Sequence, residues 1–263
     1  MKIVTKYNSI FFTSIKSNLT YIGEMFYGTI FMLVIMYIFI NLWKAAFATN
    51  NMHVNMGYVE TVWYLLITQA IIFSLNPAYI TISEEVQSGS IAYTMNRPYN
   101  YLFYHFFNGL GDSVIRFIIN LSTGSVLVIS LVGSLQFKLF YVIPLVVIVF
   151  MSFLLNYCIN ALIGLSSFFI EEAEGVAFIY KKFLYLLGGV LIPLDFFPTT
   201  LKTIVNYLPF AFITFSPSKL FVHFDVHQYY QVFSGQLIWI CLLTILLGIV
   251  FRIGRRKLTI NGG

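Results

Sequence analysis

The feature that most limits how this chain can fold is a series of apolar stretches at 22–43, 59–80, 108–132, 140–170 and 232–251. Each is long enough for the roughly 20 helical residues that cross about 30 Å of hydrocarbon. Backbone polar groups in hydrocarbon must be bonded within the spanning segment, so these stretches predict helices. Hydrophobic residues make up 59% of the chain and charged residues 10%, which is unlike a soluble domain. We expect an all-α integral membrane protein with a single transmembrane domain over residues 1–263.

Segments outside these stretches complete the expected topology. Residues 1–21 interleave lysines with apolar side chains, a pattern typical of a basic amphipathic helix at a membrane surface. Residues 183–194 are too short to cross unless their helix begins before Lys181, which gives six transmembrane helices in total. Residues 195–231 are apolar but interrupted by prolines, so we expect one or two short re-entrant helices between the fifth and sixth crossings. No small-residue cleavage site follows the first stretch, which we expect to be a retained span.

The distribution of basic residues predicts the orientation, because Lys and Arg are enriched in cytoplasmic loops. With both termini inside, the inner segments hold Lys2, Lys6, Lys16, Arg97, Arg116, Lys181, Lys182, Arg252, Arg255, Arg256 and Lys257. The outer segments hold Lys44, Lys138, Lys202 and Lys219. This asymmetry predicts a multi-pass protein of the plasma membrane with cytoplasmic termini. It also accounts for the net charge of +5 without a nucleic-acid partner.

Residues 83–98 form a short polar segment between two apolar stretches, on the predicted cytoplasmic side. Ser83 is a candidate N-cap, and Glu84 and Glu85 suit the positive N-terminal end of a helix. Proline disfavours helical geometry in the residue before it, so Arg97-Pro98 is the expected end. The segment predicts one amphipathic docking helix, whose apolar side is supplied by Ile82, Val86, Ala92, Tyr93 and Met95.

The chain has no convincing nucleotide site. Gly23 and Gly28 have the spacing of a phosphate-binding loop, but Thr29 stands where such a loop has lysine, and the segment leads into a membrane span. We therefore expect no cofactor in this chain and no enzymatic activity of its own. Any energy from ATP is expected to come from another chain.

Two pairs of polar residues have helical i, i+4 spacing. His223 and His227, with Asp225 between them, match metal ligands on a helix, but an interfacial polar cluster is the favoured interpretation and no metal is expected. Asp112 and Arg116 lie near the cytoplasmic end of the third span. An intrahelical ion pair is the favoured interpretation there, and a role in gating is the alternative.

Two segments resemble permease subunits of type-2 ABC exporters. Residues 82–90 (ISEEVQSGS), followed by Asn96-Arg97-Pro98, resemble the loop after that family's second span. Residues 188–198 (GGVLIPLDFFP), followed by Leu208-Pro209-Phe210, resemble its re-entrant region after the fifth span. The residues of that region we single out are Pro193, Asp195, Phe196, Phe197 and Pro198. The resemblance covers nearly the whole chain, with the interfacial helix, six spans and both landmarks in order.

The resemblance implies a dimer with a second permease, identical or different, and two cytoplasmic ATPase subunits that bind ATP and Mg. The 83–98 helix would be the coupling helix seated in a groove of the ATPase. The implied charged contacts are Glu84, Glu85 and Arg97, while Ile91 and Tyr93 fill the groove and Gly89 permits close approach. Gln87 and Ser88 complete this surface. Because the family exports amphiphiles, the resemblance implies ATP-driven export of a lipid, peptide or drug-like molecule, with membrane lipids as further partners.

Two other classes of protein are compatible with the sequence. An ATPase-independent secondary transporter normally carries ionisable residues at mid-span or paired broken helices, and the chain has one broken region and no internal repeat. A non-transporting membrane partner, such as an immunity factor, would use the same docking helix. A copurifying ATPase separates the exporter from the secondary transporter, and ATPase stimulation by substrates separates it from a passive partner.

Overall fold

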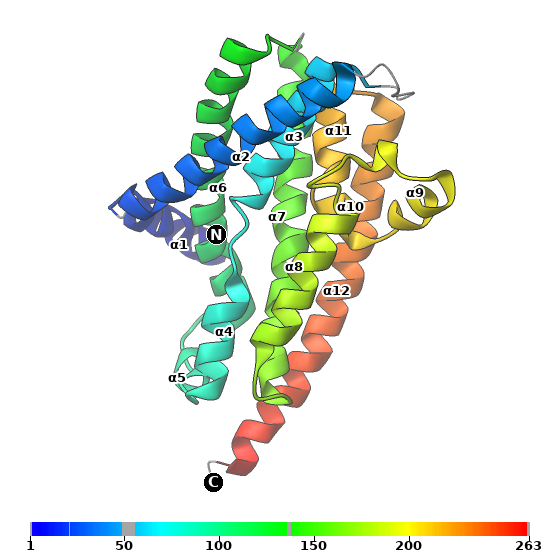
Figure 1. Ribbon diagram of the computed structural model, residues 1–263. Coiled ribbons are helices and arrows are strands. Elements are labelled where there is room, and N and C mark those ends of the chain that lie inside the picture. The colour runs from blue at the N-terminus through cyan, green and yellow to red at the C-terminus, as the bar shows by residue number, and fades with distance from the viewer. Residues whose placement is uncertain (1, 21, 49–55, 136–137, 262–263) are drawn as a thin grey trace.

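The computed structural model of the chain is a bundle of long helices with shorter helices near both ends (Figure 1). The structure describes residues 2–20, 22–48, 56–135 and 138–261, and it has no strand within these ranges. The first six α-helices are α1 (Lys2–Thr20), α2 (Ile22–Ala48), α3 (Tyr58–Ile72), α4 (Ala78–Gln87), α5 (Ile91–Met95) and α6 (Tyr101–Leu131). The others are α7 (Val142–Leu165), α8 (Ala173–Leu187), α9 (Thr199–Val205), α10 (Pro209–Ile213), α11 (Phe215–Val222) and α12 (Val226–Asn261). The expected all-α fold is confirmed for these residues.

Four helical segments are long and apolar enough to cross a membrane by themselves. They cover Met25–Ala48, Tyr101–Leu131, Leu139–Phe168 and Val226–Arg256. These correspond to the first, third, fourth and last expected spans. The third begins at Tyr101 rather than Asn108, because Asn100 caps the helix there by accepting a hydrogen bond from the Phe103 amide at 3.2 Å.

The second and fifth expected spans are composite or short. α3 ends at Ile72 and α4 begins at Ala78, so the break expected at Asn76-Pro77 occupies residues 73–77. α8 begins before Lys181, as its length requires. Neither α3 nor α8 reaches spanning length alone, and the six-crossing arrangement therefore stays a prediction. The loop expected between the first two spans includes residues 49–55, which lie outside the described residues.

The N-terminal helix packs across the side of α6 (Figure 1). The Ser14 hydroxyl donates a hydrogen bond to the Asn108 carbonyl oxygen at 2.6 Å. Gly111 allows this approach, since a Cβ there would lie 2.8 Å from the Ser14 side chain. The expected helix over 1–21 is thus present as α1, anchored to the first third of α6.

Hydrogen bonds to side chains hold the non-helical turn after α8 inside the bundle. The Tyr64 hydroxyl on α3 donates to the Gly189 carbonyl at 2.7 Å, and the Thr214 hydroxyl donates to the Gly188 carbonyl at 2.6 Å. Gly189 has a φ of 68°, a conformation that favours glycine. Irregular backbone at membrane depth needs such internal partners because lipid offers none.

Candidate functional site

The polar segment after α3 folds as two helices rather than one. α4 starts at Ala78, directly after the break at 73–77, and ends at Gln87. Gly89 has a φ of 73°, which reverses the chain before α5 begins at Ile91. In Figure 1 this α4–α5 hairpin lies near the end of the molecule that also holds the C-terminal end of α12, away from α9–α11.

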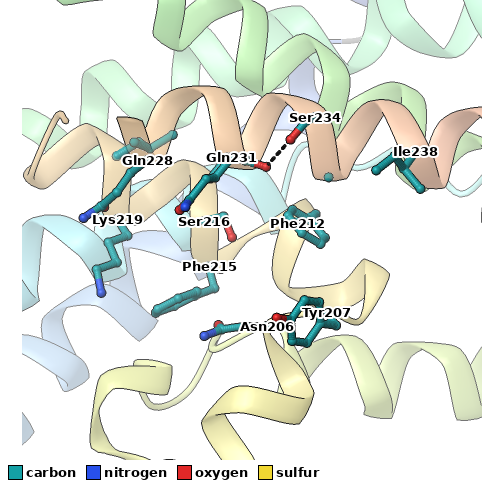
Figure 2. Close-up of a pocket in the computed structure, with 13 residues that line it drawn as sticks. Asn206, Tyr207, Phe212, Phe215, Ser216, Lys219, Gln228, Gln231, Ser234 and Ile238 are labelled. Atoms are coloured by element: carbon teal, nitrogen blue, oxygen red, sulfur yellow. Dashed lines mark hydrogen bonds between the residues drawn. The ribbon is translucent and has the colours of Figure 1, made fainter. Parts of the chain in front are cut away.

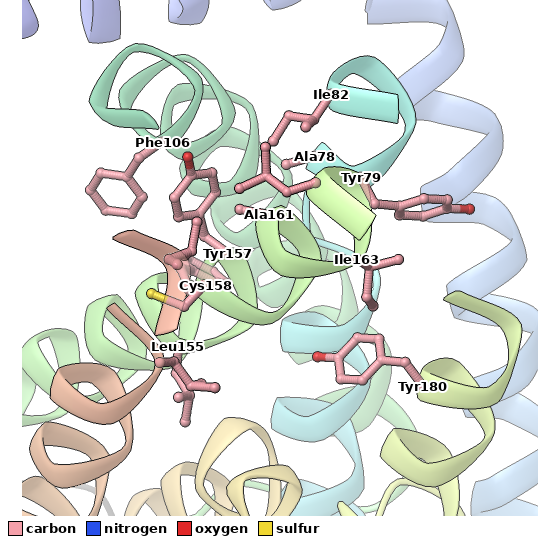
Figure 3. Packing of buried hydrophobic residues seen from close by; sticks show 14 of the residues in the cluster. Ala78, Tyr79, Ile82, Phe106, Leu155, Tyr157, Cys158, Ala161, Ile163 and Tyr180 are labelled. Carbon is pink, nitrogen blue, oxygen red and sulfur yellow. The ribbon is translucent and has the colours of Figure 1, made fainter. Parts of the chain in front are cut away.

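One face of α4 is packed tightly against α7. Ile82 is fully buried, and Gly164 of α7 lies directly against it: a Cβ at Gly164 would be 2.7 Å from the Ile82 Cβ. Figure 3 shows Ala78 and Ile82 of α4 beside Ala161 of α7, within a larger buried cluster. Small residues on both helices permit this close contact, as is common between helices in membranes.

Polar contacts add to this packing along the whole length of α4. The Ser83 and Ser167 hydroxyls lie 2.6 Å apart, and the Gln87 amide donates to the Glu171 carbonyl at 2.7 Å. On the α8 side, the Lys181 ammonium donates to the Tyr79 hydroxyl at 3.2 Å. A displacement of α4 therefore has to move, or break away from, the adjoining ends of α7 and α8.

Glu85 connects the hairpin to α6. Its Oε2 accepts hydrogen bonds from the Tyr101 hydroxyl at 2.7 Å and the Thr94 hydroxyl at 3.3 Å, and it lies 3.4 Å from the His105 Nε2. Burial raises the pKa of Glu85, but the contacts with His105, Tyr101 and Thr94 outweigh it, and the net pKa is below the ordinary value. The ionised carboxylate thus joins α4, α5 and α6 at one point.

The segment after α5 is attached to the N-terminal helix. The Lys6 ammonium of α1 donates to the Pro98 carbonyl, and the Asn100 amide donates to the Tyr7 hydroxyl at 3.0 Å. Tyr7 also stacks on Phe107 of α6, with ring centroids 5.3 Å apart. The hairpin is therefore in contact with α6, α7 and α8, and the segment that follows it is in contact with α1.

The remaining face of the hairpin is open to solvent. Tyr93 is 80% exposed, the largest exposed fraction of any apolar or aromatic side chain in the hairpin. Glu84, Gln87, Ser88 and Arg97 are also exposed. Tyr and Arg are enriched at protein interfaces, and here an exposed tyrosine and an exposed arginine lie in one short segment of chain. We call Glu84, Gln87, Ser88, Tyr93 and Arg97 the exposed hairpin face.

The model of the ABC-2 family transporter proteins matches residues 55–262, which include the hairpin and every helix after it. The chain belongs to the ABC-2 transporter family. A comparison with curated proteins found no match. The resemblance inferred from residues 82–98 and 188–210 is thereby confirmed at the level of the family.

In this ABC-2 transporter, the structure of the hairpin corrects three roles that were assigned from the sequence. Ser83 does not cap a helix, because α4 starts upstream and places Ser83 mid-helix, buried against Ser167. Ile91 is fully buried in the chain's own core, so its side chain is not available to a partner. Glu85 is engaged within the chain, so Glu84 is the exposed carboxylate. The positive φ at position 89 favours glycine, and a Cβ there would have no other atom within 4 Å.

The ion pair expected on the third span is present in α6. The Arg116 Nε lies 2.7 Å from Asp112 Oδ1, and Oδ2 of the same carboxylate accepts from the Asn76 amide at 3.1 Å. Gly109 makes room for Asn76, whose side chain would be 3.0 Å from a Cβ there. The pair therefore ties the break between α3 and α4 to α6. Its role in gating stays a prediction.

The region expected to be re-entrant contains three short helices, α9, α10 and α11, rather than the expected one or two. Pro209 begins α10, and Pro217 lies in the first turn of α11. Asp195 lies in the turn before α9, and its Oδ1 is 2.5 Å from Lys202 Nζ and 2.8 Å from Lys219 Nζ. Burial raises the pKa of Asp195, but these two ammonium groups lower it below the ordinary value overall.

The other residues singled out in this region are structural. Phe196 packs on Trp43 of α2 with ring centroids 4.8 Å apart, and Phe197 joins the same core cluster. Pro193 precedes the 3₁₀ turn Leu194–Phe196, and Pro198 precedes α9. These residues anchor the turn that carries Asp195.

One of the two histidines considered as metal ligands, His223, contacts a carboxylate on another helix. The His223 Nε2 lies 3.2 Å from Glu60 Oε2 on α3. Among the described residues, no group of three or more His, Cys, Asp or Glu side chains has the arrangement of a metal site. Asp225 instead caps the start of α12 by accepting from the Gln228 amide at 2.8 Å.

The residues that hold the hairpin in place are not apparent from the sequence: they are Thr94, Tyr101, His105, Gly164 and Ser167. Tyr101 and His105 are four residues apart and therefore lie on the same face of α6. This spacing could have indicated that the two side chains share a partner. Gly164 stands out as a small residue in an apolar stretch. Neither pattern says which partner the residue meets.

Replacing Glu85 with glutamine is expected to loosen α5 from α6. The glutamine oxygen can still accept from Tyr101 and Thr94, but both bonds lose the charge that makes them roughly twice as strong, and the contact with His105 loses its carboxylate. Amide hydrogen exchange in 88–98 should therefore rise by about tenfold, the factor for 1.4 kcal/mol. The matched control is Glu84→Gln, which changes the exposed neighbour and should leave exchange unchanged. Equal exchange in the two variants would contradict the internal role of Glu85.

Acid is expected to have the same effect on the unmodified protein. Because the pKa of Glu85 is lowered in the fold, its stabilisation is present above the ordinary carboxyl pKa of about 4.3 and is lost as the pH falls through the lowered value. Exchange in 88–98, corrected for the intrinsic pH dependence, should rise in that window in the unmodified protein. In Glu85→Gln this carboxyl contribution should be absent.

Proposed function

We propose that this chain is the permease subunit of an ATP-driven exporter of an amphiphilic substrate. In this proposal a cytoplasmic ABC ATPase docks on the exposed hairpin face, and ATP and Mg bind to that partner. Six crossings, cytoplasmic termini and pairing with a second permease belong to the same proposal. Membership of the ABC-2 transporter family and the predominance of apolar helices support it.

The observation that carries the proposal is the two-sided character of the α4–α5 hairpin. Its exposed face offers Tyr93, Glu84 and Arg97 to a partner. Its other face is packed on α7 through Ile82 and bonded to α6 through Glu85. A partner that moves the hairpin therefore acts directly on the transmembrane helices.

The proposed mechanism is mechanical and uses the chain's own contacts. Closure of the ATPase pair on ATP pushes the hairpin, and the contact between Ile82 and Gly164 transmits this force to α7. The Glu85–Tyr101 hydrogen bond transmits it to α6, and the Lys6–Pro98 contact transmits it to α1. Packed helices respond to such forces by shifting between discrete arrangements, which suits alternating access.

The break at 73–77 is the proposed flexible point of this movement. α3 is buried along nearly its whole length, whereas α4 belongs to the hairpin. Residues 73–77 have no continuous helical ladder between the two, so α4 can tilt without dragging α3. The bond from Asn76 to Asp112 keeps the break against α6 during the movement.

Purification of the intact chain from its native membrane in mild detergent tests the proposal. We expect a cytoplasmic protein with ATPase activity to copurify, and we expect amphiphiles to change its rate of ATP hydrolysis. Recovery of the chain without any ATPase would contradict the exporter. An ATPase whose rate does not respond to amphiphiles would favour a non-transporting membrane partner.

A further inference from the structure

A cleft lies between the re-entrant helices and α12, at the opposite end of the molecule from the α4–α5 hairpin (Figures 1 and 2). Its volume is about 570 Å³, which falls within the range of about 300–1,000 Å³ found for ligand pockets. Figure 2 shows side chains of α10, α11 and α12 converging on it. Its lining includes Tyr207, Phe212, Ser216, Lys219, Gln228, Gln231, Gly235 and Ile238.

Along α12 the lining runs from two glutamines, through Val232, Ser234 and Gly235, to an apolar end at Ile238. Gln228 and Gln231 lie at one end, and Ile238 lies at the other, as Figure 2 shows. Ten residues separate Gln228 from Ile238, a rise of about 15 Å in a helix. Lys219 and Ser216 of α11 face the polar end. This gradient has the length and order of a polar headgroup followed by the first part of an aliphatic chain.

An aromatic ring forms the floor of the cleft. Phe212 lies against Gly235 of α12, where a Cβ would be 2.3 Å from the ring. Behind the ring, the Gln236 amide donates to the Phe212 carbonyl at 3.0 Å and to the Ser152 hydroxyl at 3.1 Å. The floor is therefore fixed to both α7 and α12, and the shape of the cleft is set by packing.

The charged group at the polar end is a lysine. Lys219 is the one charged side chain among the described residues that line the cleft. It shares Asp195 with Lys202, and both ammonium groups contact the same oxygen, Oδ1. Neither Asp195 nor Asp225, which accepts from the Gln228 backbone amide, is among the described residues that line the cleft. A headgroup inside the cleft therefore meets an ammonium group, which complements an anion.

We propose that this cleft binds an anionic phospholipid from the leaflet at this end of the molecule. Lys219, Ser216, Gln228 and Gln231 contact the phosphate headgroup, and Phe212, Tyr207 and Ile238 contact the upper acyl chain. A free phosphate would contact only the polar end of the cleft. The apolar end presents Ile238, which is 65% exposed, and Tyr207, which is 74% exposed, and an acyl chain would cover both. The site goes beyond the proposed function, because lipid binding here needs no ATPase.

Photolabelling of the full-length chain tests the site. The protein is reconstituted in phosphatidylcholine nanodiscs with phosphatidylglycerol that carries a diazirine in its acyl chain, and labelled peptides are mapped by mass spectrometry. We expect saturable labelling in 207–216 and 228–240. Unlabelled phosphatidylglycerol should compete, and phosphatidylcholine or inorganic phosphate should not.

Two matched pairs of variants locate the site. Ile238→Trp fills the apolar end, and Leu237→Trp adds the same bulk at the same depth on an exposed position outside the cleft. Lys219→Gln removes the headgroup contact, and Lys202→Gln removes the other salt bridge to Asp195 without altering the cleft lining. We expect Lys219→Gln to weaken labelling by about tenfold, the factor for one charge-assisted hydrogen bond. Ile238→Trp should weaken labelling because the indole occupies the space of the acyl chain, and Leu237→Trp should not.

The outcomes that would overturn the site are equally definite. Non-saturable labelling, or equal competition by phosphatidylcholine, would refute a selective site for an anionic lipid. Competition by inorganic phosphate alone would make it an anion site rather than a lipid site. Equal losses in Lys219→Gln and Lys202→Gln would assign the effect to the Asp195 anchor. None of these readouts uses the ATPase, so the proposed function is tested separately.

Discussion

Replacing Gly164 with valine is expected to separate α4 from α7. The first added carbon would lie 2.7 Å from the Ile82 Cβ, a distance that real side chains essentially never show, and a tight 3.1 Å from the Tyr79 carbonyl oxygen. Overpacking of this kind costs about 1–3 kcal/mol and forces a backbone shift. The contact that we propose to carry force from the ATPase would then be lost.

A disulfide reports this separation without any knowledge of the substrate. The Ser83 and Ser167 hydroxyls are 2.6 Å apart, so Ser83→Cys with Ser167→Cys should cross-link on mild oxidation in a background with Cys158→Ala and Cys241→Ala. Adding Gly164→Val should slow cross-linking by at least about tenfold, the factor for 1.4 kcal/mol. In the proposed complex, the same variant should lose amphiphile-stimulated ATPase activity.

Gly248→Val is the matched control for Gly164→Val. Gly248 also lies inside a long helix, α12, but a Cβ there has nothing within 4 Å. We expect normal cross-linking and normal ATPase stimulation in this variant. Normal cross-linking in Gly164→Val would show that α4 accommodates the side chain, and it would contradict a tight contact between α4 and α7.

Removing the two principal groups of the exposed hairpin face is expected to detach the proposed ATPase. Tyr93→Ala deletes an aromatic ring that is 80% exposed, and Glu84→Lys reverses the exposed carboxylate. Residues that dominate an interface contribute about 2 kcal/mol or more each, and Tyr is enriched among them. The double variant should therefore lower affinity by at least about a hundredfold, measured as ATPase retained on the purified chain.

The control for this surface must leave the fold intact. Tyr207→Ala removes an equally exposed ring, 74% exposed, from the opposite end of the molecule and should retain the ATPase. The Ser83–Ser167 cross-link should form normally in both variants, because neither substitution touches α7. Full retention of the ATPase in the double variant would place the docking surface elsewhere on the molecule.

Much of the architecture follows from apolar length and from helix breakers. The stretches at 22–43, 108–132, 140–170 and 232–251 each became a long helix, since only internally bonded helices satisfy the backbone in lipid. Asn76-Pro77 interrupted the second stretch because proline breaks a helix. α8 began upstream of Lys181, as expected because residues 183–194 alone are too short to cross. These features depend on residues close in sequence.

The details of the hairpin depend on residues far apart in sequence and were harder to predict. Ser83 has the chemistry of an N-cap, but the break at 73–77 starts α4 earlier and leaves Ser83 to face Ser167. Glu84 and Glu85 are adjacent and chemically equivalent, yet only Glu85 points toward Tyr101 and His105. Which carboxylate turns inward is decided by the packing of α4 on α6 and α7, and local sequence carries no record of it.

The same limit applies to the opposite end of the molecule. The prolines at 209 and 217 predicted a broken region, but the convergence of two lysines on one oxygen of Asp195 is a tertiary feature. The cleft beside it depends on Gly235 admitting the Phe212 ring, a contact between two different helices. Motif spacing therefore located this region, and the structure supplied its chemistry.

The most direct test of the account is photocross-linking from position 93 of the intact chain in its native membrane. With a photoreactive phenylalanine analogue in place of Tyr93, we predict a cross-link to a cytoplasmic protein that carries a nucleotide-binding ATPase domain. The same analogue in place of Tyr207 should give no such product. Cross-links from position 93 that reach only lipid or membrane-embedded proteins would contradict the claim that the α4–α5 hairpin is the docking site of an ATPase.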